Sequence, residues 1–436
     1  MWVSAILTSH PQHQSHWLPH PEVHDNFLSE RVIISKTIMS ALQKPFARVH
    51  LQNRPPPPVP VFDEREEEDE EDQPALSASD SSSSASSTGT IIPSPTRNLF
   101  EKPRVSRSQY DSLPWQNFFD TELYLDNDTL RHHAYFSAPR SLDAPLFCFH
   151  HGAGASGLSF ASLTKAIKDA LPEAGFLSPD CRGHGETQMP EDQTLDLSLN
   201  TLATDLTFVV DATRIRMGWP KLPPVILLGH SLGGAVVTEL AYKKLLGNAV
   251  LGYGVFDVVE GSAMDALQSM ESYLSTRPKS FTSVANGIEW HVRSRTIRNT
   301  MSARVSVPPL LVQHQSEDSA TTWLWRTDLS ATKPFWENWF TGLSSKFLSV
   351  SGAGKLLILA GTDRLDKELM IGQMQGKYQL QVFPDAGHFV HEDQPEKTAM
   401  VVADFWRRND RSALVLPPKV DDLIRQGKLK PAQQNK

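Results

Sequence analysis

The stretch PVILLGHSLGGAVVTEL, residues 224–240, decides the fold of this 436-residue chain. It opens with a short apolar run of strand length, Pro224–Leu228, and continues after one turn into a segment of helical length, Leu232–Leu246. The turn holds the pattern Gly-x-Ser-x-Gly, which between a strand and a helix is typical of a nucleophile elbow that exposes Ser231 above a sheet. The pattern alone also fits an ordinary glycine-rich turn, so its interpretation depends on partners elsewhere in the chain.

Strand-like runs and helix-like segments alternate on both sides of this stretch, from about residue 108 onward. The alternation predicts an α/β fold with a mostly parallel central sheet and helices on both faces. The long interval at about 258–346 reads as mostly helical, and we expect it to form a cap above the sheet, where binding loops gather. The predicted strands are Pro145–Phe149, Gly175–Ser178, Pro224–Leu228, Leu251–Phe256, Lys355–Ala360 and Tyr378–Phe383, and the predicted helices are Phe160–Ala170, Leu195–Thr213, Leu232–Leu246 and Gln394–Arg408.

Residues 1–105 have a different amino-acid composition. They combine the proline run Pro55–Pro58, an acidic run at 63–72 and the serine-rich stretch Ser77–Ser87, with few apolar residues at any regular spacing. Such a composition cannot form a core, so we predict a disordered, low-complexity N-terminal extension. The catalytic domain is expected over 106–415, followed by a short tail at 416–436.

The charge and cysteine content exclude several classes of protein. The formal net charge of −8 is accounted for by DEREEEDEED, residues 63–72, so the rest is near neutral and gives no support for a nucleic-acid partner. Two cysteines in a chain of this length indicate a reducing compartment, so we expect a cytoplasmic or nuclear location. The first ten residues, MWVSAILTSH, lack the basic residues of a signal peptide, and the apolar runs are too short to span a membrane.

A glycine-rich loop follows an earlier predicted strand, in FHHGAG at 149–154. Such a loop can direct backbone N–H groups toward a reacting carbonyl, and we predict an oxyanion hole formed by the amides of Ala153 and Leu232. Phosphate binding is the alternative, but the lysine of a P-loop is absent. His150 and His151 are expected to be structural. The chain carries no metal-ligand set and no dinucleotide fingerprint, so neither a metal nor a cofactor is predicted.

A serine nucleophile needs a histidine base downstream, and the segment AGHFVH at 386–391 offers two. It follows the last predicted strand and precedes the last helix, where a loop can carry an imidazole over Ser231. We favour His388, directly after a glycine. His391 is followed by two acidic residues, which indicate a solvated helix start.

Two aspartates end predicted strands between the serine and the histidine. They are Asp257, in VFDVVEG, and Asp363, in LAGTDR. By fold alone Asp363 is favoured, because the strand before the histidine loop usually presents the acid in α/β hydrolases. Arg364 offers a different role for Asp363, as a salt-bridged structural carboxylate.

Several longer strings resemble the protein phosphatase methylesterases, and the resemblance covers about residues 108–408. It implies an α/β-hydrolase fold and a cofactor-independent enzyme that removes the methyl ester from the C-terminal leucine of the type-2A protein phosphatase catalytic subunit. The strings are DVVEG at 257–261 with AMDAL at 263–267, Arg298 with SARV at 302–305, AGTDRLDK at 360–367 and IGQMQGK at 371–377.

The resemblance also implies the site residues. It gives Ser231 as the nucleophile, His388 as the base and Asp257, at the start of DVVEG, as the acid, which overturns the choice of Asp363 made from the fold. Five tryptophans fall in the expected cap and either line a groove for an apolar tail or pack cap helices. Two alternatives stay open: a general small-ester or lipid hydrolase with the same triad, and a phosphatase-binding inhibitory protein whose esterase activity is secondary. The tryptophans are Trp290, Trp323, Trp325, Trp336 and Trp339.

Overall fold

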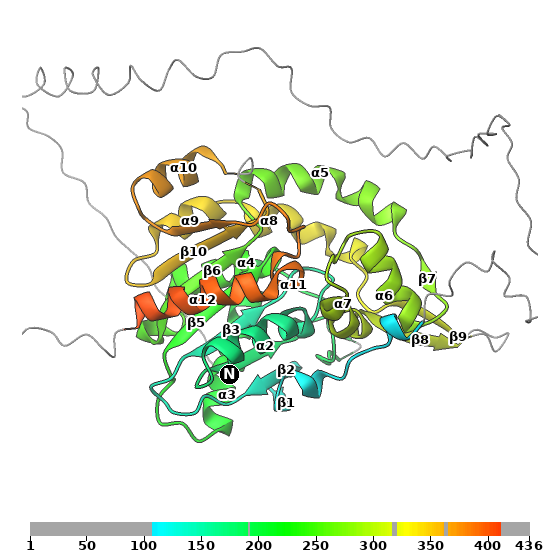
Figure 1. Cartoon of the computed structure of the whole chain (residues 1–436), viewed down its shortest axis with the longest axis horizontal. Coiled ribbons are helices and arrows are strands. Elements are labelled where there is room, and N and C mark those ends of the chain that lie inside the picture. The colour runs from blue at the N-terminus through cyan, green and yellow to red at the C-terminus, as the bar shows by residue number, and fades with distance from the viewer. Residues whose placement is uncertain (1–106, 191, 316–320, 362–364, 411–436) are drawn as a thin grey trace, which may run out of the picture. The chain divides into compact units, whose positions relative to one another are not determined.

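The centre of the computed structural model is an eight-stranded sheet with strand order β1-β2-β4-β3-β5-β6-β10-β11 (Figure 1). The structure describes residues 107–190, 192–315, 321–361 and 365–410. The pairs β1/β2 and β2/β4 are antiparallel, and every pair from β4 to β11 is parallel, which confirms the predicted α/β fold. The strands are β1 (Thr121–Asp126), β2 (Arg131–Ser137), β3 (Leu146–His150), β4 (Gly175–Pro179), β5 (Val225–His230), β6 (Val250–Phe256), β10 (Gly354–Leu359) and β11 (Gln379–Val382).

The sheet separates two hydrophobic cores. Successive side chains of a strand point to opposite faces, so β5 directs Val225 and Leu227 into one core and Ile226 and Leu228 into the other. All six residues of β5 and all five of β3 are buried. A strand buried on both faces reads as a continuous apolar run, which is why the central strands were predictable from sequence.

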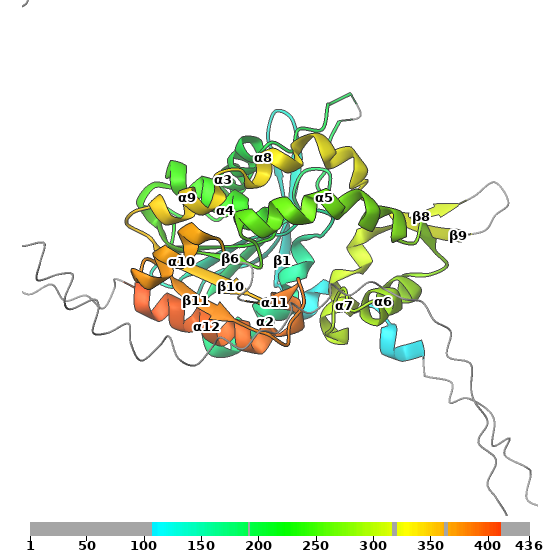
Figure 2. The ribbon, with the colours of Figure 1, turned by 90° about the horizontal axis from the view of Figure 1, so that it is seen from above.

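Helices cover both faces of the sheet. In Figure 2, α3 and α4 lie on one side of the sheet, and α2 and α12 on the other, in agreement with the two cores to which these helices contribute. The predicted bounds of these four helices are close to those observed. The helices outside the long interval after β6 are α2 (Ala161–Ala170), α3 (Leu199–Arg216), α4 (Leu232–Lys243), α10 (Lys367–Met374), α11 (Val390–Asp393) and α12 (Pro395–Asn409).

The interval between β6 and β10 is not as uniformly helical as expected. It holds five helices among its described residues, together with a small antiparallel sheet of order β7-β9-β8. The segment TTWLW is rich in β-branched and aromatic residues, which favour strands, whereas its partner LVQHQ holds a single β-branched residue, so the sequence signal is weak in these runs of five residues. The helices are α5 (Glu260–Thr276), α6 (Val284–Arg293), α7 (Thr300–Ser306), α8 (Trp336–Phe340) and α9 (Leu343–Ser349), and the strands are β7 (Ser280–Phe281), β8 (Leu311–Gln315) and β9 (Thr321–Trp325).

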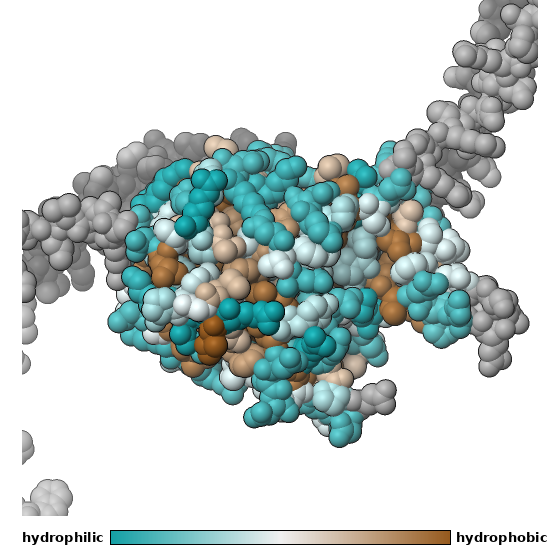
Figure 3. All heavy atoms as spheres, turned by 90° about the horizontal axis from the view of Figure 1, so that it is seen from below, coloured by the Kyte–Doolittle hydropathy of each residue, from teal (hydrophilic) through white to brown (hydrophobic). Residues whose placement is uncertain are grey.

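One face of the molecule is mainly hydrophilic, with small and separate hydrophobic patches (Figure 3). Within the described ranges, none of the helices combines the length and the apolar character of a membrane-spanning segment. The predicted extension at 1–105 and the predicted tail at 416–436 lie outside the described residues.

Candidate active site

Ser231 lies at the junction of β5 and α4, in a strained backbone conformation. Its φ of 52° and ψ of −121° fall in a region that residues with side chains seldom adopt. The Ser231 amide donates a hydrogen bond of 3.0 Å to the Phe256 carbonyl, which ties the turn to the end of β6. Strain of this kind costs about 1–3 kcal/mol and clusters at functional sites, so it supports Ser231 as the candidate nucleophile.

The glycines on either side of Ser231 are required by close backbone approach. A Cβ atom on Gly229 would lie 2.0 Å from the Gly233 carbonyl oxygen, and one on Gly233 would lie 1.9 Å from the His150 carbonyl oxygen. Both distances are far below van der Waals contact. The motif therefore packs the elbow against its own helix and against the end of β3.

We expect Gly233→Ala to destabilise the fold by about 3 kcal/mol or more, because the added methyl group meets backbone atoms that cannot move aside. Gly261→Ala is the matched control, since the nearest atom to its new Cβ would be 3.8 Å away. Alanine also favours a helix over glycine, so this control should be neutral or slightly stabilising. Urea unfolding of both variants measures the difference, and equal midpoints would contradict the close-packing explanation.

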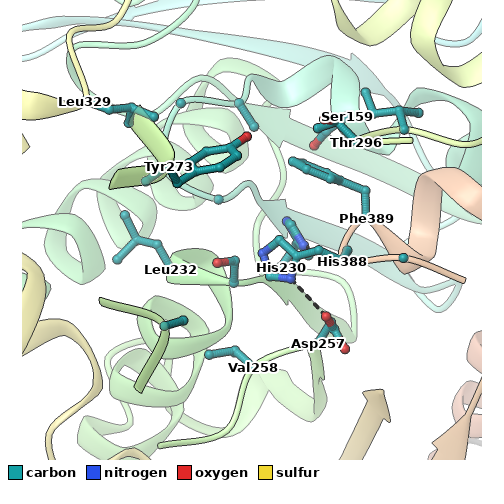
Figure 4. A pocket seen from close by; sticks show the side chains of 18 of the residues that line it. Ser159, His230, Leu232, Asp257, Val258, Tyr273, Thr296, Leu329, His388 and Phe389 are labelled. Atoms are coloured by element: carbon teal, nitrogen blue, oxygen red, sulfur yellow. Dashed lines mark hydrogen bonds and ion pairs between the residues drawn. The ribbon is translucent and has the colours of Figure 1, made fainter. Parts of the chain in front are cut away.

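His388 and Asp257 form a hydrogen-bonded pair beside Ser231. The His388 Nδ1–H donates to Asp257 Oδ2 at 2.9 Å (Figure 4). The Asp257 side chain is fully buried and its Oδ1 accepts a hydrogen bond of 2.8 Å from the Ala360 amide at the end of β10. With Nδ1 protonated, the Nε2 of His388 is the nitrogen that is free to accept a proton.

Ser231 and His388 line the same cavity, but no hydrogen bond joins the Ser231 hydroxyl to the His388 ring among the described residues. Hydrogen bonds of this kind often tighten only in the substrate complex. Asp363, the acid favoured from the fold alone, lies outside the described residues. The catalytic role of Asp257 stays a prediction, supported by its contact with His388.

His230, within the Gly-x-Ser-x-Gly pattern, holds the backbone of the base. Its Nε2–H donates to the His388 carbonyl oxygen at 2.9 Å, and the two rings lie 4.6 Å apart between centroids. Burial, together with the neighbouring His388 and His391, keeps the pKa of His230 well below its usual value, so the ring is neutral. This role could not be predicted from the sequence, because it depends on a contact between residues 158 positions apart.

Asp393 and Arg298 clamp the loop that carries His388. One carboxylate oxygen of Asp393 accepts from the Arg298 amide at 2.7 Å, and the other accepts from the Gly387 amide at 2.6 Å. The Arg298 guanidinium in turn donates to the Asp385 carbonyl at 2.6 Å. These bonds fix the loop on both sides of Gly387, directly before the base.

The prediction that His391 lies at a solvated helix start is wrong. Its side chain is fully buried and stacks on Phe160, with 4.5 Å between ring centroids. Burial lowers the pKa of His391 to about 3, so this histidine is neutral. The acidic residues that suggested solvation are themselves enclosed: Glu392 is buried, and burial raises the pKa of its carboxyl well above the usual range.

The two amides predicted to hold an oxyanion belong to residues that line the same cavity as Ser231. Leu232 is the first residue of α4, where an amide has no acceptor within its own helix. The Ala153 amide donates to no other backbone group among the described residues. The loop that carries it approaches the elbow closely, because a Cβ on Gly152 would lie 3.1 Å from the Ser231 Cβ. The geometry suits an oxyanion hole, and that role stays a prediction.

Two buried histidines hold this loop through their ring nitrogens. His151 Nε2 accepts from the Cys181 amide at 2.9 Å, and its Nδ1–H donates to the Gly152 carbonyl at 2.8 Å. His184 Nε2 accepts from the Gly154 amide at 2.9 Å. Each ring needs one unprotonated nitrogen for these bonds, so both must be neutral.

Stability should therefore fall in acid. Burial lowers the pKa of His150 and His291 to about 4 and that of His151 and His391 to about 3. The unfolded chain binds protons at these histidines as the pH falls through about 6.5, whereas the folded chain does not, so unfolding becomes easier below that pH. Each histidine contributes up to about 1.4 kcal/mol per pH unit.

The loss of stability in acid is measured by the midpoints of urea unfolding between pH 7.5 and 5.0. His391→Phe keeps a ring against Phe160 and removes one titrating group, so it should weaken the pH dependence by about 1 kcal/mol per pH unit. Midpoints that stay constant over this range would contradict the neutral state of the buried histidines.

The elbow, the base and the loop open on a cavity of about 870 Å³. Its walls come from the two loops described above, from α5 and α8, and from the connections around β9. Trp290, Trp325, Trp336 and Trp339 line it, and Trp323 does not. The indole N–H groups of Trp325, Trp336 and Trp339 are held by protein acceptors, so these rings are fixed walls.

Comparisons with known proteins show the family of this chain. The family model described as the alpha/beta hydrolase family matches residues 147–401. A solved structure, E-2-(acetamidomethylene)succinate hydrolase, covers 66% of this chain and 99% of its own with a TM-score of 0.52. At 19% identity it supports the fold alone.

Curated relatives named protein phosphatase methylesterase 1 match most of the chain. The relative from Gibberella zeae is 59% identical over 346 residues, which cover 78% of this chain and 86% of the relative. The one from Aspergillus fumigatus is 61% identical over 345 residues, covering 77% and 82%. The one from Schizosaccharomyces pombe is 46% identical over 313 residues, covering 70% and 87%. The chain therefore belongs to the protein phosphatase methylesterase family of α/β hydrolases.

Proposed function

We propose that this chain is a serine carboxylesterase that demethylates the C-terminal leucine methyl ester of the type-2A protein phosphatase catalytic subunit. The observation that carries the proposal is that three features lie at one cavity. They are the strained Ser231, the hydrogen-bonded pair of His388 and Asp257, and the amides of Ala153 and Leu232. The relatives named protein phosphatase methylesterase give the class of substrate.

Acylation begins when the Ser231 Oγ attacks the ester carbonyl carbon while His388 Nε2 takes the hydroxyl proton. Asp257 keeps the imidazole in the correct tautomer and stabilises its charged form. The amides of Ala153 and Leu232 donate hydrogen bonds to the oxyanion. The intermediate collapses when His388 passes the proton to the departing methoxy oxygen, and methanol leaves an acyl-serine behind.

Deacylation repeats these steps with water. His388 takes a proton from a water molecule, whose oxygen attacks the acyl carbon. The bond from this carbon to the Ser231 oxygen then breaks, and the serine regains its proton from His388. The products are the free leucine carboxylic acid and the regenerated enzyme.

The cavity wall suits a leucine side chain. Apolar side chains of Leu232, Val258, Ala263 and Leu267 lie on it near the start of α5, and burying a leucine against such a wall contributes about 2 kcal/mol. We also infer a cytoplasmic or nuclear location, because Cys148 and Cys181 are free, buried thiols, as expected in a reducing compartment.

Selectivity separates this function from that of a general ester hydrolase. We would compare kcat/KM for the methylated phosphatase catalytic subunit with that for a small chromogenic ester. A large preference for the phosphatase supports the proposal, because the long cavity binds more than the ester itself. Equal values, or a preference for the small ester, would favour the general hydrolase.

A further inference from the structure

One face of α5 forms a long wall of the cavity. Its lining residues recur at intervals of three and four, which is the spacing of one helix face. From Ala263 to the end of the helix this wall runs for roughly 20 Å, at 1.5 Å per residue. Figure 2 shows α5 extending from the central sheet toward β8 and β9. The lining residues of this face include Ala263, Ala266, Leu267, Met270, Tyr273 and, just past the helix end, Arg277.

Arg277 stacks on Trp325 at the far end of this wall. Its guanidinium carbon lies 3.6 Å from the centroid of the indole ring. The ring is itself fixed, because Trp325 Nε1–H donates to the Pro278 carbonyl at 2.7 Å and the ring packs edge-on against Phe281 and Trp290. The cation is therefore held in one place on a rigid platform.

No carboxylate pairs with this guanidinium within the described residues, and none of its N–H groups donates to a described acceptor. The side chain is half-buried, and burial lowers the pKa of Arg277, although arginine stays charged at neutral pH. A partly desolvated cation with five unused donors favours an anionic ligand over solvent.

The charges that face the cavity are predominantly positive. Its arginines are Arg277, Arg295 and Arg298, and of these Arg298 forms an ion pair with Asp393 at 3.8 Å. Among the residues that the structure describes, its acidic side chains are Asp257, which is bonded to His388, and Glu392, whose pKa burial raises well above its usual range. A methyl ester carries no charge, so the ester group itself gives no reason for this excess.

We propose that Arg277, stacked on Trp325, is a specificity subsite that binds an acidic side chain of the methylated tail. The inference rests on the proposed function and adds a substrate requirement to it. An extended peptide spans about 3.3 Å per residue, so a wall of this length corresponds to about six residues. The side chains of Arg277 and of the acidic residue reach toward each other and shorten the backbone distance between them. The acidic residue therefore lies roughly three to six positions before the ester-bearing leucine.

Peptides that end in leucine methyl ester test this subsite. One series carries a single aspartate at each of these positions, and a matched series carries asparagine, which has the same shape without the charge. For the native enzyme we expect kcat/KM to be about tenfold higher with aspartate at the best position, because hydrogen bonds to charged groups are the stronger ones. Equal values at every position would overturn the subsite without any variant being made.

Arg277→Gln should remove this preference. We expect the aspartate peptide to lose about tenfold in kcat/KM and the asparagine peptide to change by less than about threefold. Arg277→Lys should keep part of the preference, because the charge remains while the planar stacking is lost. Arg293→Gln is the control, since Arg293 is exposed, pairs with Glu289 on α6 and does not line the cavity. Equal losses on both peptides would overturn the subsite.

The proposed function and the Arg277 subsite are tested by different outcomes. If leucine methyl ester peptides and the methylated phosphatase both resist hydrolysis while a chromogenic ester is cleaved, the proposed function is wrong, and the subsite falls with it. If the peptides are cleaved but their charge has no effect, the subsite alone is wrong. Thermal midpoints of the Arg277 variants establish whether they fold.

Discussion

Replacing Ser231 by alanine should lower methyl ester hydrolysis by a factor on the order of 10⁵ to 10⁶. The substitution removes the nucleophilic oxygen and little else. The amide bond to the Phe256 carbonyl stays, and alanine has the same Cβ as serine, so the strain at φ 52° does not increase. The oxyanion amides and the base remain, which leaves only weak residual catalysis.

Methanol release, thermal midpoint and phosphatase binding should be measured together on this variant. We expect no methanol release above the residual level, an unchanged thermal midpoint and retained binding of the phosphatase, because the cavity keeps its shape. Ser275→Ala is the control, since Ser275 is an exposed serine near the end of α5, and should match the native enzyme. A Ser231→Ala enzyme that turns over at a rate close to native would show that the elbow is not catalytic.

Asp257→Asn should lower turnover roughly 10⁴-fold, as in related triads. The reason lies in the orientation of the carboxylate. Its Oδ1 accepts from the Ala360 amide, so an asparagine keeps its carbonyl oxygen there and turns its NH2 group toward His388. Nδ1 of His388 must then accept a hydrogen bond, which shifts the proton to Nε2, where it blocks transfer from serine.

Asp363→Asn is the informative comparison, because Asp363 is the alternative acid. We expect it to cost far less activity than Asp257→Asn and to act mainly on the thermal midpoint. Turnover and midpoint of both variants should be measured on the same methyl ester. A well-folded but inactive Asp363→Asn enzyme would move the acid to the later strand and refute the role assigned to Asp257.

The sequence predicted those features that are local along the chain. The central strands are continuous apolar runs because both of their faces are buried, and the elbow has a short pattern dictated by backbone crowding at Gly229 and Gly233. The order of serine, acid and histidine along the chain also guided the choice of Ser231, Asp257 and His388. For the acid, the fold alone favoured Asp363, whereas family resemblance pointed to Asp257, the residue that contacts His388 in the structure.

Features that depend on distant contacts were missed. His391 reads as a solvated residue from its neighbours but is enclosed by Phe160 from another element. Arg277 and Trp325 lie far apart along the chain, and neither has a local signal that indicates the other. Short strands such as β7 carry too few residues for a pattern to emerge, so their pairing is decided by packing.

The proposed methylesterase activity is tested most directly by the intact mass of purified, methylated type-2A phosphatase catalytic subunit before and after incubation with this enzyme. We predict that the phosphatase loses the mass of one methylene unit, as methyl ester becomes acid, that one equivalent of methanol is released, and that Ser231→Ala produces neither change. An unchanged phosphatase mass, in a preparation that still cleaves a small chromogenic ester, would contradict the assignment of this chain as its methylesterase.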